Sequence, residues 1–317
     1  MRALVTGGAG FVGSHLVDAL LARGDHVVAV DCFTPYYDRA RKEANLAGAR
    51  QASHFTLVKS DLRVGELEPL LADVDVVFHL AAQPGVRTSW ADGFPEYVAH
   101  NIVATQRLLE AVRRAAPATR VVYASSSSVY GNALRYPTYE DDPLQPYSPY
   151  GVTKLAGEHL CAAYAANWNL RTISLRYFTV YGPRQRPDMA IHRLCDAAFS
   201  GAPFTRYGDG TQVREFTYVG DVVAANLLAA DADVASATCI NVAGGSEISL
   251  SDLIALVEQC AGRSITVDAK PAQQGDARRN AGAIDRAREL LGWSPTVSLE
   301  AGIRMQLAAD HGGALSA

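Results

Sequence analysis

Residues Arg2–Gly13 read RALVTGGAGFVG, a short apolar run followed by glycines at positions 7, 10 and 13. The run predicts a buried strand, and the apolar spacing of Ser14–Arg23 predicts a helix that stops at Gly24. Glycines in such a turn let the backbone approach a pyrophosphate at the helix N-terminus, where N–H groups and the helix dipole favour anions. The glycines alone are equally compatible with a tight turn that binds nothing. The neighbouring residues are needed to distinguish the two interpretations.

The context is an acidic residue, Asp31, at the end of the next apolar run, His26–Val30. A carboxylate there can accept a hydrogen bond from a ribose hydroxyl and would repel a ribose 2′-phosphate, which favours NAD over NADP. Three nearby cations would instead favour NADP, namely Arg39, Arg41 and Lys42. We interpret those three as a solvated helix face.

Strand-like and helical patterns alternate through the first half of the chain, which predicts right-handed βαβ crossovers and a parallel sheet. The expected strands are Arg2–Thr6, His26–Val30, Phe55–Lys59, Val74–Leu80, Arg120–Ala124 and Thr172–Arg176, with helices near Asn101–Ala115 and Gly157–Ala166. After about Gly182 the alternation loosens, and later helices are expected at Leu250–Cys260 and Asp285–Leu291. We expect an α/β fold with a cofactor domain in residues 1–176, a returning segment near 214–243, and a smaller substrate domain in 177–213 and 244–317.

Composition excludes several classes of protein. The 317 residues are 49% hydrophobic and 20% charged with a net charge of −4, whereas a general nucleic-acid or membrane-surface binder carries a basic excess. The chain has no apolar run of the roughly 18 residues that span a bilayer, and no signal-peptide pattern. Five scattered cysteines without a CxxC pair indicate reduced thiols in the cytoplasm, and the eight histidines show no metal-binding spacing.

Four consecutive serines, Ser125–Ser128, follow the expected strand Arg120–Ala124, although buried hydroxyls need partners. Further on, Tyr150 and Lys154 stand four residues apart, which places both on one face of a helix. A cation beside a phenol lowers the pKa of the phenol and so helps it act as a base. On its own this pair is more often an ordinary feature of a surface helix. Together with the glycine loop and Asp31 it predicts an active site.

These motifs identify the chain as resembling the extended short-chain dehydrogenase/reductases, in particular the nucleotide-sugar epimerases and dehydratases. The resemblance covers nearly the whole chain and implies a Rossmann-type doubly wound sheet. It also implies Ser126, four residues before Tyr130, as the catalytic serine, Tyr150 as the base and Lys154 as its partner. The implied residues that bind the cofactor NAD are Gly7, Gly10, Phe11, Val12, Gly13, Asp31, Asp61, Leu62, Leu80, Ala81, Ala82, Tyr150, Lys154 and Tyr177.

The segment FTVYGPRQRPDM at 178–189, with PGVR at 84–87, resembles the UDP-glucuronate 4-epimerases of this family. In the galactose-type epimerases and the decarboxylases Asn replaces Thr179, and acids replace Ser127 or Ser128 in the dehydratases and decarboxylases. The resemblance implies a UDP-sugar substrate bound by Arg87, Ser127, Ser128, Thr179, Arg186, Arg214 and Arg278, with Arg186 suited to a sugar carboxylate and Arg214 and Arg278 to the diphosphate. A solvated loop cation is the alternative for Arg186, and an internal salt bridge for Arg214 and Arg278.

The expected reaction is NAD-dependent C4 epimerisation of UDP-glucuronate to UDP-galacturonate through a 4-keto sugar. A UDP-glucuronate decarboxylase and a 4-epimerase of neutral UDP-hexoses stay open as alternatives, and a non-catalytic dinucleotide-binding regulator is disfavoured by the intact Ser126, Tyr150 and Lys154. Relatives commonly pair through two helices, here Asn101–Ala115 and Gly151–Ala166, so we expect a homodimer. Small residues that would allow close packing are Ala104, Ala111, Ala156 and Ala163.

Overall fold

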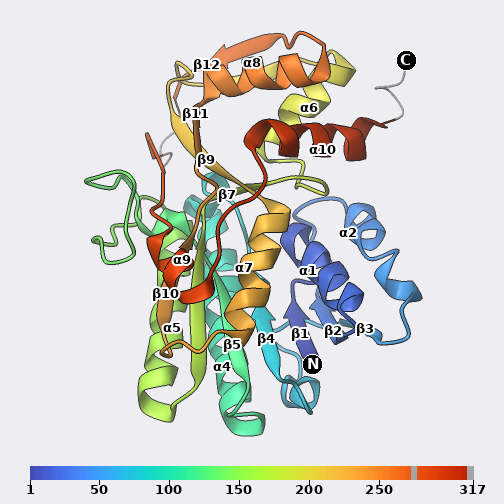
Figure 1. The fold of residues 1–317 in the computed structure, drawn as a ribbon, viewed down its shortest axis with the longest axis vertical. Helices are drawn as coiled ribbons and strands as arrows, with labels where there is room; N and C mark the ends of the chain where they lie inside the picture. The colour runs from blue at the N-terminus through green and yellow to red at the C-terminus, as the bar shows by residue number, and fades with distance from the viewer. Residues whose placement is uncertain (273–276, 313–317) are drawn as a thin grey trace.

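The computed structural model describes residues 1–272 and 277–312 and is built on a seven-stranded parallel sheet (Figure 1). The strand order is β10-β6-β5-β4-β1-β2-β3, and every neighbouring pair is parallel. The strands are β1 (Arg2–Thr6), β2 (His26–Asp31), β3 (Phe55–Lys59), β4 (Val76–His79), β5 (Arg120–Ser126), β6 (Arg171–Tyr177) and β10 (Thr238–Val242). The order reverses on either side of β1, as in doubly wound dinucleotide-binding folds, so the predicted fold class is confirmed.

Both faces of the large sheet are covered by helices. Helices α1 (Phe11–Ala22) and α7 (Val219–Asp231) pack on one face, in front of the sheet in Figure 1. Helices α4 (Ala104–Ala115) and α5 (Pro149–Trp168) pack on the other. Successive residues of β1 alternate between the two cores, with Ala3 and Val5 in one and Leu4 in the other. A strand buried on both faces must be apolar throughout, which explains the continuous apolar run.

A smaller part of the chain lies at the carboxyl end of the large sheet, at the top of Figure 1. It contains the three-stranded sheet β11-β9-β7 and the two-stranded sheet β12-β8. Its elements are β7 (Thr179–Tyr181), α6 (Ala190–Ser200), β8 (Phe204–Tyr207), β9 (Val213–Tyr218), β11 (Ser246–Ser249), α8 (Leu250–Ala261), β12 (Val267–Lys270) and α10 (Leu299–His311). A separate core joins α6, α8 and α10, with Leu194, Val257 and Ile303 at its centre.

Several element boundaries differ from the sequence expectation. Helix α5 begins at Pro149, eight residues before the expected Gly157, because the Ser148 side chain accepts a hydrogen bond from Gly151 N and Pro149 suits the first helical position. Strand β5 runs two residues beyond Ala124 to Ser126. The expected helix from Asn101 is a π-helical turn over Val98–Val103 that continues into α4.

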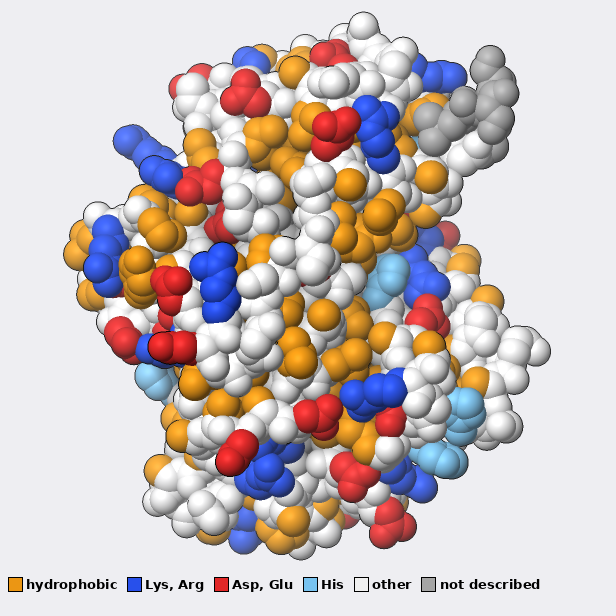
Figure 2. Space-filling view, in the orientation of Figure 1, with side chains coloured by type: hydrophobic (Ala, Val, Ile, Leu, Met, Phe, Trp, Pro, Cys, Tyr) orange, Lys and Arg blue, Asp and Glu red, His pale blue; other side chains and the backbone are white. Residues whose placement is uncertain are grey.

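The remaining short elements connect these layers. They are α2 (Arg39–Asn45), α3 (Phe94–Tyr97), α9 (Asp285–Leu291) and 3-10 turns at Ala49–Gln51, Glu68–Leu71, Arg87–Ser89, Ala91–Gly93 and Ser127–Val129. Within the described residues, no helix combines the length and apolarity needed to cross a bilayer. Figure 2 shows positive and negative side chains interspersed over one face, which agrees with the small net charge of −4.

Candidate active site

A cavity of about 890 Å³ lies between the carboxyl ends of the large-sheet strands and the smaller part of the chain. One wall comes from the β1–α1 turn and the ends of β2, β4, β5 and β6, and the other includes Phe204, Tyr207 and Leu250. The predicted site residues in its wall are Gly7, Gly10, Phe11, Val12, Gly13, Asp31, Asp61, Leu62, Leu80, Ala81, Ala82, Arg87, Ser126, Ser127, Ser128, Tyr150, Lys154, Tyr177, Thr179, Arg186 and Arg214. Open α/β sheets bind ligands at this edge.

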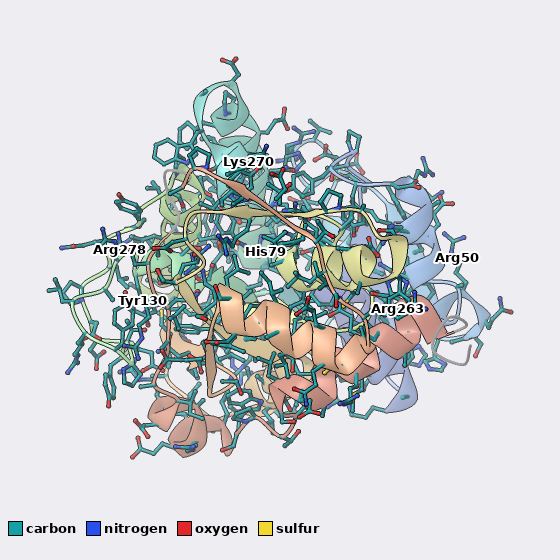
Figure 3. The ribbon with its side chains drawn as sticks, turned by 90° about the horizontal axis from the view of Figure 1, so that it is seen from above. Arg50, His79, Tyr130, Arg263, Lys270 and Arg278 are labelled. Atoms are coloured by element: carbon teal, nitrogen blue, oxygen red, sulfur yellow. The ribbon has the colours of Figure 1, made fainter. Side chains whose placement is uncertain are left out.

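One predicted residue, Arg278, is not in the wall. Its side chain is exposed, and its backbone N–H donates to Asn132 Oδ1 at 3.0 Å. In the view of Figure 3, Arg278 lies towards the periphery and away from the central His79. Gly275 and Asp276, which belong to the same motif, lie outside the described residues.

The glycine loop leaves room for a large anion at the start of α1. Gly7 has a φ of +70°, and a Cβ there would come within 2.8 Å of Ala81 N. A Cβ on Gly13 would overlap the Gly7 carbonyl oxygen. No side chain caps α1 at Gly10, so the N–H groups of its first turn face the cavity with their partial positive charge. These features fit the diphosphate of a dinucleotide.

Asp31 is fixed at the end of β2. Its Oδ1 accepts from Phe33 N at 2.7 Å, and its Oδ2 accepts from Ala9 N at 3.2 Å. The ammonium of Lys42 lies 3.8 Å from Oδ1. Lys42 is only 5% exposed, so its assignment to a solvated helix face was wrong. Burial beside Asp31 explains the difference, since a buried ammonium needs an anionic or carbonyl partner.

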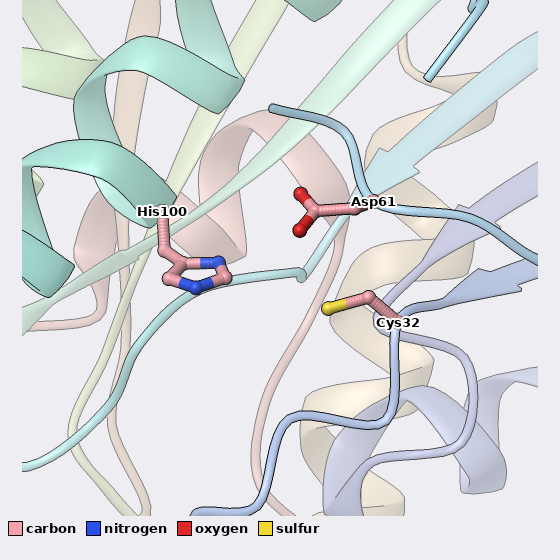
Figure 4. A group of neighbouring side chains, drawn as sticks. All are labelled: Cys32, Asp61 and His100. Carbon is pink, nitrogen blue, oxygen red and sulfur yellow. The ribbon is translucent and has the colours of Figure 1, made fainter. Parts of the chain in front are cut away.

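Cys32, Asp61 and His100 meet in the cavity wall near Asp31, with ligand atoms within 4.8 Å of one another (Figure 4). Asp61 already accepts hydrogen bonds from the Arg63 guanidinium at 2.8–3.1 Å. Burial raises the pKa of the Cys32 thiol, which disfavours the thiolate that binds metal. The three groups therefore fit a cofactor-cavity wall better than a metal centre.

Tyr150 lies in the first turn of α5 and Ser126 ends β5, so the two come together at the cavity. Burial raises the pKa of Tyr150, and a hydrogen bond with Ser126 and the charge of Arg186 partly oppose that effect. The expectation that Lys154 lowers this pKa is not met in the protein alone. Lys154 Nζ instead donates to the Ala124 carbonyl at 2.8 Å, because a fully buried ammonium requires an acceptor. Burial lowers the Lys154 pKa to about 8.

All four serines of the run line the cavity, and Ser125 also makes a buried structural contact. Ser125 Oγ donates to the buried carboxylate of Glu158 on α5, which also receives a two-pronged ion pair from Arg176. These contacts anchor the end of β5 against α5. Ser126 Oγ accepts from Ser128 N at 3.1 Å, and Ser126, Ser127 and Ser128 all face the cavity.

A buried hydrogen-bond chain that the sequence analysis missed supports this region. His79 Nδ1 lies 2.8 Å from Thr6 Oγ1, and Nε2 lies 2.9 Å from Thr105 Oγ1. Since Thr105 donates its hydroxyl proton to Asn101 O, we assign the His79 proton to Nε2. Burial, together with the charge of Lys154, lowers the His79 pKa to about 3 and keeps the ring neutral.

Asn101 extends this series of hydrogen bonds to α5, the helix that carries Tyr150. Its Nδ2 donates to Thr153 Oγ1 at 3.0 Å, and Thr153 donates to the Tyr150 carbonyl at 2.8 Å. The π-helical turn around Asn101 gives this side chain its inward position. No local pattern marks His79 or Asn101, because their partners come from strands and helices distant in sequence.

Three arginines that the sequence predicts to bind substrate line the cavity. Arg186 makes a two-pronged ion pair with Asp188, from Nε to Oδ1 at 3.0 Å and from Nη2 to Oδ2 at 2.9 Å. The guanidinium of Arg87 lies 4.4 Å from the ring centre of Tyr207. Arg214 Nη1 donates to Val213 O at 2.9 Å. Thr179, which begins β7, lies in the same wall.

The parallel sheet, the glycine loop and the edge cavity define an α/β protein of the dinucleotide-binding class. A family model described as GDP-mannose 4,6 dehydratase matches residues 4–306, and the chain belongs to this family of extended short-chain dehydrogenase/reductases. A Bacillus subtilis protein named as an uncharacterized UDP-glucose epimerase, YtcB, is 42% identical over 309 residues, 97% of each chain. A probable UDP-glucuronate 4-epimerase of Rhizobium meliloti is 35% identical over 325 residues, 96% of this chain and 95% of its own.

A crystal structure of UDP-glucuronic acid 4-epimerase from Bacillus cereus, in complex with UDP-glucuronic acid and NAD, is similar over the whole fold. It has a TM-score of 0.94 and 42% sequence identity, and the match covers 98% of each chain.

Proposed function

We propose that this chain is a UDP-glucuronate 4-epimerase that uses NAD to interconvert UDP-glucuronate and UDP-galacturonate. The observation that carries the proposal is the cavity wall where Ser127, Ser128 and Thr179 stand with the cation Arg186. Neutral donors and a guanidinium suit a sugar carboxylate, whereas acids at the serine positions would repel it. Similarity to the Bacillus cereus enzyme, whose crystal structure contains UDP-glucuronic acid and NAD, supports the same substrate and cofactor.

The residues of the chain have separate roles in proton transfer at the C4 hydroxyl. Tyr150 takes the proton from the C4 hydroxyl and returns it, and Ser126 shares the hydrogen bond. When bound, NAD⁺ supplies a hydride acceptor for C4 and a positive charge that lowers the pKa of Tyr150. Lys154 fixes the end of β5 through the Ala124 carbonyl. The 4-keto sugar would then turn so that C4 takes the hydride back on its other face, and Tyr150 would return the proton to the C4 oxygen.

The remaining predicted residues hold the ligands. We propose that the glycine loop binds the cofactor diphosphate and that Asp31 binds the adenosine ribose. Arg87 and Arg214 line the cavity, which supports the proposal that they bind the UDP diphosphate. Arg278 lies outside that wall, so the cavity does not support the expected contact of Arg278 with the diphosphate.

We also propose two domains with the boundaries expected above. The packing of α7 and β10 on the large sheet supports a returning segment. Two elements do not follow the proposed boundaries, because β9 pairs in the small sheet and α9 packs on β10. Five free cysteines, three of them buried, support a cytoplasmic location.

We propose a homodimer that pairs through the helices α4 and α5. Of the small residues expected at this interface, Ala104 and Ala111 are 2% exposed because they face the sheet. They are therefore not free for a partner. Ala156 is partly exposed and Ala163 is exposed, and Val103 and Val152, at 43% and 48% exposed, add apolar surface on the turn before α4 and on α5.

The test of the reaction is product analysis after incubation of the purified protein with UDP-glucuronate. Formation of UDP-galacturonate without carbon dioxide supports the proposal. Release of carbon dioxide would instead identify a decarboxylase. Faster conversion of UDP-glucose than of UDP-glucuronate would identify an epimerase of neutral UDP-hexoses. UDP-glucose is included because the Bacillus subtilis relative is named as a UDP-glucose epimerase.

A further inference from the structure

The guanidinium of Arg186 is already held along one edge by the protein. Its Nε and Nη2 both donate to Asp188, at 3.0 and 2.9 Å, which is the side-on arrangement of an arginine–carboxylate pair. Of its three nitrogens, Nη1 is the one that takes no part in this pair. The end-on edge, made by Nη1 and Nη2, therefore remains for a second carboxylate.

Arg186 belongs to the catalytic cavity rather than to the solvent. Its side chain is 19% exposed, and its charge lowers the pKa of Tyr150 while the charge on Tyr150 raises that of Arg186. Arg186 and Tyr150 also line the same cavity. A carboxylate bound at the end-on edge would thus belong to a ligand whose reacting carbon lies beside Tyr150.

Asp188 is itself held by another residue of the cavity wall, Tyr36. The hydroxyl of Tyr36 donates to Asp188 Oδ2 at 3.3 Å, and the Tyr36 ring centre lies 5.8 Å from the Arg186 guanidinium. Tyr36 follows β2 and the cofactor-side Asp31, whereas Arg186 and Asp188 follow β7. The three side chains line one cavity and link the segment after β2 to the segment after β7.

We propose that Asp188, braced by Tyr36, is a positioning residue that aims the end-on edge of Arg186 at the carboxylate of the UDP-sugar. The inference rests on the proposed function and adds a residue that determines substrate selectivity. An arginine without this side-on partner would have several rotamers, and ordering it on substrate binding would cost affinity. Asp188 removes that cost before the substrate arrives.

The test is the affinity of the NAD-loaded protein for two sugars that differ in the carboxylate. The Asp188→Asn substitution is made in a Tyr150→Phe background, which stops turnover, and titration calorimetry gives Kd for UDP-glucuronate and UDP-glucose. We expect Kd for UDP-glucuronate to rise about tenfold or more, the scale of a lost charged contact, and Kd for UDP-glucose to change less than about twofold. Asp188→Glu should restore part of the difference because it keeps the anion.

Glu300→Gln serves as the matched control, because it removes the carboxylate from another arginine pair, Arg304–Glu300, on the exposed surface of α10. It should leave both affinities unchanged. Equal weakening of both sugars by Asp188→Asn would show a merely structural role and overturn the inference. Tighter binding of UDP-glucuronate would also overturn it, because Asp188 would then be a competing anion.

Failure of this inference is separable from failure of the proposed function. Turnover of UDP-glucuronate by the wild-type protein is measured alongside the titrations. Absence of turnover would overturn the proposed function. If the wild-type protein turns over UDP-glucuronate normally but Asp188→Asn changes Kd for both sugars equally, only the role of Asp188 is overturned.

Discussion

The pKa values of single groups show how burial sets the chemistry of this site. Burial raises the Tyr150 pKa and lowers the pKa values of Lys154 and His79. In each case the low dielectric disfavours the charged form. A phenol in this state requires nearby positive charge to act as a base, and Arg186 already contributes part of it.

Replacement of Tyr150 by Phe should lower turnover by about 10²-fold or more, the scale of a lost acid–base group. The ring and its edge contact with Tyr97 remain, so the protein should fold and keep NAD. The measurement is the rate of UDP-galacturonate formation. Tyr164→Phe, on the same helix but hydrogen-bonded to Gln106 and Glu110, should retain near-normal turnover. A folded Tyr150→Phe protein with wild-type turnover would remove Tyr150 from the reaction.

His79 should make the protein sensitive to acid. Its pKa is about 3 in the folded state and about 6.5 in an unfolded chain. Between these values the unfolded state binds a proton that the folded state does not, so the free energy of unfolding falls as pH falls. The slope from this residue is up to about 1.4 kcal/mol per pH unit.

His79→Gln should therefore be less stable at pH 7 and lose less stability on acidification. The measurement is urea unfolding of both proteins between pH 6 and 4, where the gap between their free energies of unfolding should narrow. His159→Gln, at an exposed position of α5, should leave the slope unchanged. Parallel pH dependence of wild type and His79→Gln would contradict the assignment.

At the scale of elements, the turn into α1 and the start of α5 decide where the site can form. Gly13 packs against Gly7 at the start of α1, and the capped start of α5 brings Tyr150 to the end of β5. A strand end and a helix start meet at the same sheet edge, which concentrates backbone donors and functional side chains there.

Gly13→Ala should disrupt the glycine loop, because its Cβ would overlap the Gly7 carbonyl oxygen and displace the turn. We expect NAD affinity to fall at least about tenfold, since the loop would no longer admit the diphosphate. The measurement is NAD binding to refolded apoprotein. Gly48→Ala, where a Cβ meets nothing within 4 Å, is the control and should bind normally. Unchanged affinity in Gly13→Ala would place the cofactor elsewhere.

At the scale of the whole molecule, the cavity exists because two separately packed parts of one chain face each other. The large sheet and the core of α6, α8 and α10 are joined across the cavity by contacts such as Arg87 with Tyr207 and Tyr36 with Asp188. The proposed reaction needs NAD and a UDP-sugar at the same time, and residues of both parts line the cavity that would hold them.

Light scattering should give a mass near twice 33.9 kDa if the chain is the proposed homodimer. Val152→Arg, on the exposed face of α5, should shift the mass towards the monomer because a buried charge at an interface is costly. Met305→Arg, equally exposed on α10, should remain dimeric. A monomer mass for the wild-type protein at micromolar concentration would contradict the pairing.

The sequence by itself determined the class of fold and the main groups of the candidate site. The glycine spacing, the apolar runs and the Tyr150–Lys154 interval are local patterns, and local periodicity specifies strands, helices and turns. Parallel strands then bring their ends to one edge, so the predicted Ser126, Tyr150 and Arg186 all reach one cavity.

Only the tertiary structure decided which partner each charged or polar group takes. It buried Lys42 beside Asp31, turned Lys154 to the Ala124 carbonyl, paired Arg186 with Asp188 and left Arg278 outside the cavity wall. It also enclosed His79 between Thr6 and Thr105. Most of these outcomes depend on burial and on residues far apart in the chain. The free energy of a charged group depends far more on how deeply it is buried than on which residues precede and follow it in the sequence.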